Sequence, residues 1–147
     1  MELYHYGVKG MKWGVRRNIA TKARAAAQYK EFAVGAERNI NRLERKKAKK
    51  GEGFSERDTI KLNKNKKLLK RYKNIREKLV KNLSQKDIAR GERQIKMMPL
   101  LLGAPVSGIV RAGNLERARL VLEDEREARY AERVKKIMIK QGFDIRD

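Results

Sequence analysis

The sequence predicts an all-α protein: a long antiparallel helical hairpin plus shorter helices, with an extended N-terminal segment. Three observations lead to this prediction. Only two of the 147 residues are proline, and Ala, Leu, Lys, Arg and Glu, which favour helices, dominate the composition. Apolar residues recur at helical spacing over long stretches, whereas no stretch alternates as a strand would. A hydrophobic content of 40% with 6% aromatics suits helix–helix seams better than a thick core.

Changes in residue usage divide the chain into three parts. Residues 1–17 form a segment in which Gly7, Gly10 and Gly14 favour an extended or turn-rich backbone. Residues 18–83 form a basic helical hairpin. Residues 84–147 comprise a short helix, an apolar linker rich in Gly and Pro, and a charged C-terminal helix.

The first helix of the hairpin is predicted from Asn18, an N-capping residue, to about Lys50, where Gly51 and Gly53 end it. Its apolar positions alternate at spacings of three and four residues, which predicts a helix-packing seam, and Lys22 is the one polar interruption. The regular part of the seam consists of Ala26, Tyr29, Ala33, Ala36, Ile40 and Leu43.

The second helix is predicted to follow Ser55, which with Asp58 resembles a capping box, and to run to about Leu83. One face carries an apolar stripe, and we expect this stripe to pack antiparallel on the first helix. The stripe consists of Leu62, Leu68, Leu69, Tyr72, Ile75, Leu79 and Leu83.

Two further helices are predicted in the last third. Ser84 caps a short helix that ends near Met98, and Asn114 caps a last helix that runs to about Gln141. Between them lies the apolar Gly/Pro linker, over 99–113. The apolar run 97–110 is too short and too rich in proline to span a membrane. We expect it to be a buried connection between helices, with a protein interface or membrane contact as alternatives.

The net charge of +21, from 39 Lys and Arg against 18 Asp and Glu, predicts an acidic partner. Residues 1–50 carry a net +10 and residues 51–95 a net +8, whereas residues 96–147 carry only +3. DNA, an anionic membrane face and an acidic protein surface are the candidates, and a merely solvated basic surface is the alternative. The candidate nucleic-acid-binding residues, which contain few aromatics for reading bases, are Lys46, Lys47, Lys49, Lys50, Lys64, Lys66, Lys67, Lys70, Arg71 and Lys73.

Nothing in the sequence points to catalysis or to a bound cofactor. There is no Cys, the sole His is His5, and no carboxylate lies between Glu2 and Glu31. The glycines near the N-terminus lack the Lys-Ser/Thr of a phosphate-binding loop. We therefore expect no enzyme, no metal and no cofactor.

Residues 4–17 concentrate rare residue types: the only His, the only Trp, two Tyr, three Gly and four cations. Trp13 lies beside Lys12 and close to Arg16 and Arg17, which is typical of an interface anchor with steering charges. A local core contact or stacking on a nucleic-acid base are the alternatives for this side chain.

The stretch His-Tyr-Gly-Val-Lys-Gly-Met-Lys-Trp-Gly-Val-Arg-Arg at 5–17 resembles a short motif found at the ends of otherwise unrelated proteins of tailed bacteriophages and prophages. The resemblance covers about a tenth of the chain. It implies a viral origin and a docking role toward another virion protein, such as the capsid or portal. The residues that match the motif are His5, Gly7, Lys9, Gly10, Lys12, Trp13, Gly14, Arg16 and Arg17, and together with Tyr6 they are the predicted docking residues.

Together these observations predict a virion-associated or assembly structural protein, located in the virion and in the host cytoplasm during assembly. It would dock through its N-terminal segment and present a basic helical surface. A sequence-independent DNA-binding or condensing protein of the phage head is one alternative. An internal protein that touches the host membrane through 97–110 is another, although we do not expect a membrane partner. The thin helical seams favour a homo-oligomer.

Overall fold

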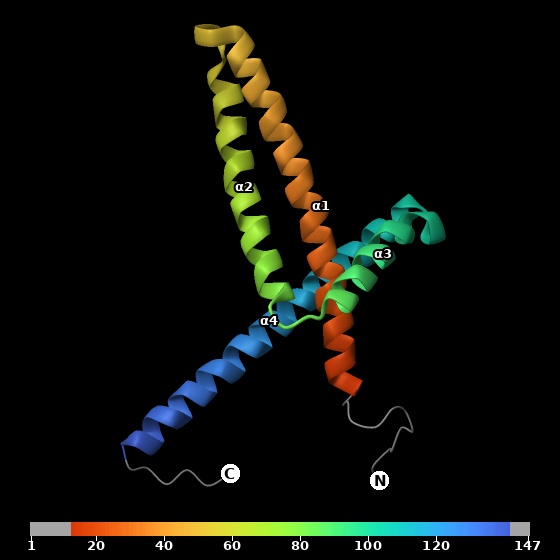
Figure 1. Ribbon diagram of the computed structural model, residues 1–147, viewed down its shortest axis with the longest axis vertical. Coiled ribbons are helices and arrows are strands. Elements are labelled where there is room, and N and C mark those ends of the chain that lie inside the picture. The colour runs from red at the N-terminus through yellow and green to blue at the C-terminus, as the bar shows by residue number, and fades with distance from the viewer. Residues whose placement is uncertain (1–12, 142–147) are drawn as a thin grey trace.

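The computed structural model describes residues 13–141, with side chains from Asn18 onward, and these residues are almost entirely helical (Figure 1). This part of the chain contains no strand, so the predicted all-α fold is confirmed. A short 3-10 helix, η1 (Gly51–Gly53), interrupts the helical path once. The long helices are α1 (Trp13–Lys50), α2 (Glu56–Val80), α3 (Gln85–Leu102) and α4 (Ala104–Lys140).

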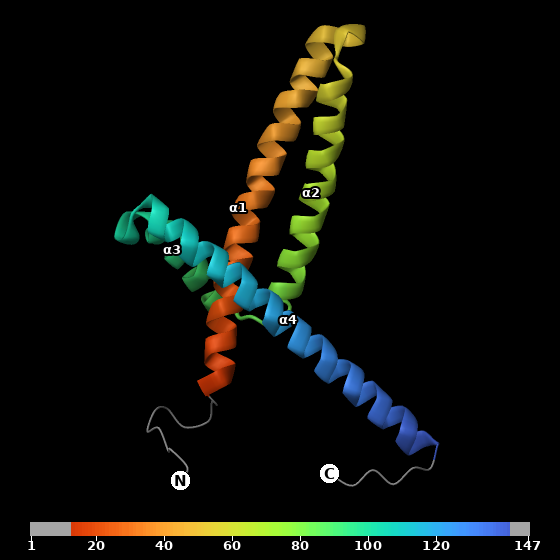
Figure 2. The ribbon, with the colours of Figure 1, turned by 180° about the vertical axis from the view of Figure 1, so that it is seen from behind.

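The helices form two antiparallel pairs that cross each other. α1 and α2 make a long hairpin, and α3 with the first half of α4 makes a second pair that crosses the N-terminal half of α1 (Figures 1 and 2). The second half of α4 leaves the crossing and extends away as a single helix. Every residue from Arg126 to Arg133 on it is exposed.

The turn of the α1–α2 hairpin follows the predicted signals. α1 ends at Lys50, and Gly51 takes a positive φ of 53° that a side chain would disfavour. Ser55 caps α2, because its hydroxyl accepts a hydrogen bond from the backbone N–H of Asp58 at 3.2 Å. α2 ends at Val80, three residues before the predicted Leu83.

The predicted seam of α1 is buried along the hairpin. Ile40 and Leu43 pack with Leu62 of α2, and Leu69 lies against this cluster. Nearer the crossing, the Tyr72 ring of α2 lies 6.0 Å from that of Tyr29 and 5.5 Å from that of Phe32, measured between ring centroids. The hairpin is therefore held by a line of single-layer contacts, as the alternating spacing predicts.

The core lies where α1 meets the other three helices. Between Thr21 and Gln28 every residue except Arg24 is buried, because α2, α3 and α4 all contact α1 and leave little of it exposed. Ala25 and Ala26 pack there with Leu79 and Ala118. The buried seam position Lys22 finds a partner across the crossing, since its ammonium lies 2.7 Å from the carboxylate of Glu125 on α4.

α1 and α3 approach each other unusually closely at Gly91. A Cβ atom at position 91 would lie 2.5 Å from both the carbonyl carbon and the carbonyl oxygen of Ala23. Gly91 is thus required by packing rather than by backbone conformation. The close approach brings Ile95 and Met98 of α3 onto Ala27 of α1.

The predicted start of the first helix was wrong. α1 begins at Trp13, so Asn18 lies within the helix and does not cap it, and the extended N-terminal segment does not reach residue 17. Residues 13–17 contain no proline, and only Gly14 disfavours a helix, so a helix already established in the core continues through them.

The predicted linker over 99–113 was also wrong, because only Gly103 separates α3 from α4. α3 continues past the predicted end at Met98 and contains Pro99. A proline cannot donate to the carbonyl four residues earlier, which here is that of Ile95. The guanidinium of Arg111 on α4 donates to this carbonyl instead, at 3.1 Å, and so removes much of the cost of a proline inside the helix.

The turn at Gly103 determines where α4 begins. Gly103 has a φ of 74°, which reverses the chain, and Pro105 then lies in the first turn of α4, where a missing N–H costs nothing. The predicted cap at Asn114 is consequently wrong, since Asn114 is buried ten residues inside the helix. The expectation that 97–110 is a buried connection was wrong as well, because most of these residues are exposed.

Candidate nucleic-acid interface

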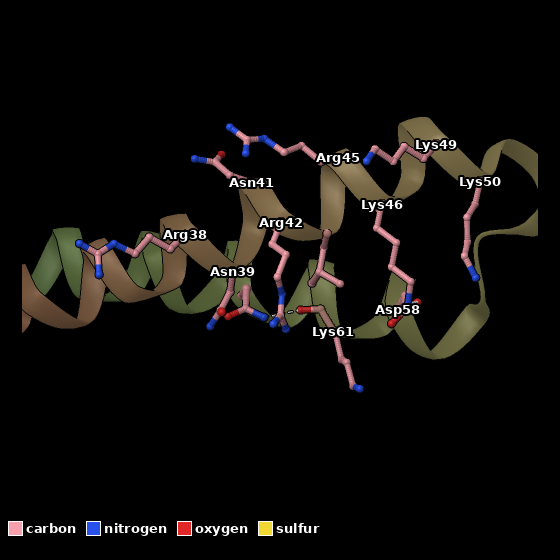
Figure 3. Close-up of a pocket in the computed structure, with 12 residues that line it drawn as sticks. Arg38, Asn39, Asn41, Arg42, Arg45, Lys46, Lys49, Lys50, Asp58 and Lys61 are labelled. Carbon is pink, nitrogen blue, oxygen red and sulfur yellow. Dashed lines mark hydrogen bonds and ion pairs between the residues drawn. The ribbon is translucent and has the colours of Figure 1, made fainter.

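The distal half of the α1–α2 hairpin carries a groove of about 1000 Å³ lined almost wholly by cationic and amide side chains. Figure 3 shows its residues on the two helices: Arg42 and Lys46 extend toward α2, whereas Arg45 and Lys49 lie on the side of α1 away from it. The lining residues, which we call the cationic groove, are Arg38, Asn39, Asn41, Arg42, Leu43, Arg45, Lys46, Lys49, Lys50, Asp58, Lys61 and Asn65.

Helical spacing aligns four of these cations. Arg38, Arg42, Arg45 and Lys49 follow one another at intervals of four, three and four residues, so their Cα–Cβ bonds lie on one side of α1, roughly opposite to the packing seam. The side chain of Arg42 turns from this row toward α2 (Figure 3). At 1.5 Å per residue the row is about 17 Å long. A regular row of positive charges of this length is suited to a linear polyanion.

Acidic residues neutralise little of this charge. Residues 38–73 hold 15 Lys and Arg against 4 Asp and Glu, a net of +11. Three of the cations pair with acids: Lys46 with Asp58, Lys66 with Glu44, and Lys73 with Glu37. No ion pair within residues 18–141 involves the other groove cations, which are Arg38, Arg42, Arg45, Lys49, Lys50 and Lys61. These six are therefore available to an external anion.

Asp58 is the one acid in the groove, and its side chain is only 12% exposed. The hydrogen bond from Lys46 lowers the pKa of Asp58 below its ordinary value, and Ser55 acts in the same direction against the opposing effect of burial. Because the pKa of Asp58 is lower in the folded state than in the unfolded state, the pair stabilises the hairpin at pH values above the ordinary pKa of a carboxyl group. That contribution is lost as the pH falls through the folded-state value.

The change Asp58→Asn should strengthen binding of the groove to DNA. It removes the competing carboxylate and leaves the Lys46 ammonium to a phosphate, so the logarithm of the binding constant should fall more steeply with the logarithm of salt, by about 0.9. Fluorescence anisotropy with a labelled duplex at several salt concentrations measures this slope. Glu132→Gln is the matched control, because Glu132 pairs with Lys136 far from the groove on α4. If Asp58→Asn leaves the salt-dependence slope unchanged, Lys46 does not contact the DNA.

The predicted cations of α2 lie on two further faces of the hairpin. Lys64, Lys67 and Arg71 line one hollow of about 450 Å³, together with Ile60, Asn63 and Leu68. Lys66, Lys70 and Lys73 line another of about 320 Å³, with Leu69 and Asn74. These are the two face groupings that helical spacing indicates.

The predicted cations of α1 divide differently. Lys46, Lys49 and Lys50 line the cationic groove, whereas Lys47 is exposed on α1 outside it. Sequence reasoning selected the densest run of lysines and overlooked Arg38, Arg42, Arg45 and Lys61. The four-three-four spacing of the row on α1 is the signal that would have found the three arginines.

Most of the predicted docking residues lie outside the described residues: His5, Tyr6, Gly7, Lys9, Gly10 and Lys12. Trp13, Gly14, Arg16 and Arg17 lie in the first two turns of α1, and their side chains are outside the described part. The backbone therefore places the end of the motif at the helix terminus opposite to the hairpin turn (Figure 1).

The arrangement fits binding to a charged backbone. The cationic groove has no aromatic lining residue on which a base could stack. Within residues 13–141, no group of three or more His, Asp and Glu side chains is placed to hold a metal ion. None of the helices in that range is long and apolar enough to cross a membrane.

Comparisons with known proteins add one match. A family model described as a family of unknown function (DUF7211) matches residues 1–19. The match ends close to residue 17, where the change in residue usage separates the N-terminal segment from the rest. No curated protein and no solved structure matched the chain.

Proposed function

We propose that this chain is a non-enzymatic structural protein of a tailed-phage particle or of its assembly. Its cationic groove binds the phosphate backbone of DNA without reading the sequence, and its N-terminal segment docks on another particle protein, such as the capsid or portal. The row of four cations in the groove, with two further unpaired cations beside it and a single acid that pairs with Lys46, is the observation that supports the DNA-binding part of the proposal.

The spread of charge favours DNA over an acidic protein surface as the partner. Cations occupy three faces of the distal hairpin rather than one bounded patch. A folded protein presents a limited interface, whereas a long polyanion can run past or around the hairpin and use all three faces. Because aromatic side chains are missing from the groove, binding should depend on charge and little on sequence.

The docking part is supported by the position of the N-terminal segment. α1 has 38 residues, so its start lies about 57 Å from the hairpin turn. The segment that resembles the phage motif ends within the first two turns of this helix, and the cationic groove occupies the other end. Such a separation suits a spacer that is attached to a particle at one end and reaches DNA at the other.

Binding to duplex DNA at two salt concentrations tests the proposal. Two duplexes of equal length and unrelated sequence should bind with closely similar affinity. Six available groove cations predict a slope of about −5 for the logarithm of the binding constant against the logarithm of salt. Fluorescence anisotropy measures both quantities. No binding at low salt, or a strong preference for one duplex, would contradict the proposal.

A further inference from the structure

The tip formed by α3 and α4 is an apolar surface that the other described helices leave uncovered. Residues 97–110 contain no charged side chain, although 39% of the whole chain is Asp, Glu, Lys or Arg. Leu100, Leu101 and Ile109 are 78%, 75% and 74% exposed. Met97, Val106 and Val110 are exposed to lesser degrees around them. A patch of this kind marks an interaction site or an aggregation hazard.

The tip is a convex projection rather than a groove. It protrudes from the crossing on the side away from the long end of α4, and both views show it clear of the α1–α2 hairpin (Figures 1 and 2). Exposed apolar side chains occur on both of its helices, and those of α3 are spread over more than half of the helix circumference. Pairing with a second copy would cover one face of the tip and leave the remaining apolar side chains in water.

Cations lie directly behind the apolar tip. Lys96 and Arg93 of α3 are exposed and make no ion pair within residues 18–141. Arg111 of α4 is held in place between the carbonyl of Ile95 and the carboxylate of Glu31, at 3.1 Å and 3.0 Å. The six apolar residues at the end of α3 extend about 9 Å beyond these cations. This length matches the depth to which interfacial helices bury their apolar residues, with cations left at the level of the headgroups.

We propose that the α3–α4 tip inserts shallowly into the interface of an anionic lipid membrane. Leu100, Leu101 and Ile109 would enter the acyl boundary, and Arg93 and Lys96 would contact the anionic headgroups. The net charge of +21 adds long-range attraction to such a surface. This inference is independent of the proposed DNA binding, because the tip and the cationic groove lie on different helices.

An environment-sensitive fluorophore at the tip tests insertion directly. The chain has no cysteine, so Leu101→Cys provides a single site for labelling with a nitrobenzoxadiazole dye. Addition of phosphatidylcholine vesicles that contain phosphatidylglycerol should shift the emission to shorter wavelength and increase its intensity. The same dye on Ile139→Cys, at an exposed position of the long end of α4, is the control and should not respond. Pure phosphatidylcholine vesicles should give a much weaker response at position 101.

Vesicle flotation separates insertion from adsorption of the basic hairpin. At about 0.5 M salt, where charge attraction is largely screened, wild-type protein should still float with the anionic vesicles. Leu100→Ser/Leu101→Ser/Ile109→Ser should reduce the partition coefficient about tenfold or more. The control Tyr130→Ser/Ile137→Ser/Ile139→Ser replaces other large exposed side chains, which are 71%, 55% and 54% exposed, and should float like wild type.

Three results would overturn the inference. The first is no response of the label at position 101 to anionic vesicles. The second is an equal response to pure phosphatidylcholine. The third is a shift that grows with protein concentration in the absence of lipid, because this would identify a second copy of the chain as the occupant of the tip.

Discussion

Replacing Arg38, Arg42, Arg45 and Lys49 together by glutamine should lower the affinity for duplex DNA about a thousandfold at about 0.1 M salt. Each of these side chains is free to release one counterion from a phosphate, and none is used within the fold in an ion pair with the described residues. The loss should be the same for unrelated duplexes, because no base contact is removed. Anisotropy titration measures the dissociation constants.

The control for this variant has the same net charge but an intact groove. Arg117, Arg126, Arg133 and Lys140 are exposed on α4 and form no ion pair with the described residues, so their replacement by glutamine also removes four positive charges. This control should lose far less affinity than the groove variant. If both variants weaken binding equally, the overall charge and not the groove is responsible.

The second large effect concerns stability. Gly91→Ala should lower the free energy of unfolding by about 2 to 3 kcal/mol, since the new methyl group would overlap the backbone of Ala23 and push α3 away from α1. Backbone atoms of a helix cannot rotate aside as a side chain can. The contact of Ile95 and Met98 with Ala27 should loosen as a result. Chemical denaturation followed by circular dichroism measures the change.

Gly35→Ala is the matched substitution, because Gly35 also lies inside a helix but has open space where a Cβ would lie. Here alanine should raise the free energy of unfolding by about 0.5 to 1 kcal/mol, through the lower backbone entropy of its unfolded state. Opposite signs for the two substitutions are therefore expected. A Gly91→Ala protein as stable as Gly35→Ala would show that the helices do not meet closely at Ala23.

Local sequence signals predicted the α1–α2 hairpin well. The glycines after Lys50 ended the first helix, and Ser55 capped the second. The alternating seam from Ala26 to Leu43 was buried, except for the half-buried Tyr29. Each of these features depends on residues close together in the chain or on one helical period. Such features need no knowledge of tertiary contacts.

The errors occurred where distant residues decide the structure. Pro99 was predicted to end the helix. The helix continues because the guanidinium of Arg111, on a different helix, donates to the carbonyl that the missing N–H of Pro99 leaves free. Lys22 was predicted to be a polar interruption of the packing seam, because its partner Glu125 lies 103 residues further along the chain and could not be foreseen. The exposure of 97–110 could not be foreseen either, because an apolar run alone does not tell whether other helices cover it.

The candidate site was only partly predicted, and the reason is similar. The prediction selected runs of consecutive lysines as binding residues. A helix distributes consecutive residues around its circumference, so Lys46 lines the groove whereas Lys47 lies outside it. The row from Arg38 to Lys49 is contiguous only on the folded helix. Grouping charges by helical spacing rather than by adjacency recovers it.

The salt dependence of DNA binding, measured for the wild type and the four-residue groove variant side by side, tests the central claim most directly. The wild type should give a slope near −5, and the variant a slope less negative by about 3 to 4, because four phosphate contacts and their released counterions are gone. Equal slopes for the two proteins would show that DNA does not lie in the groove.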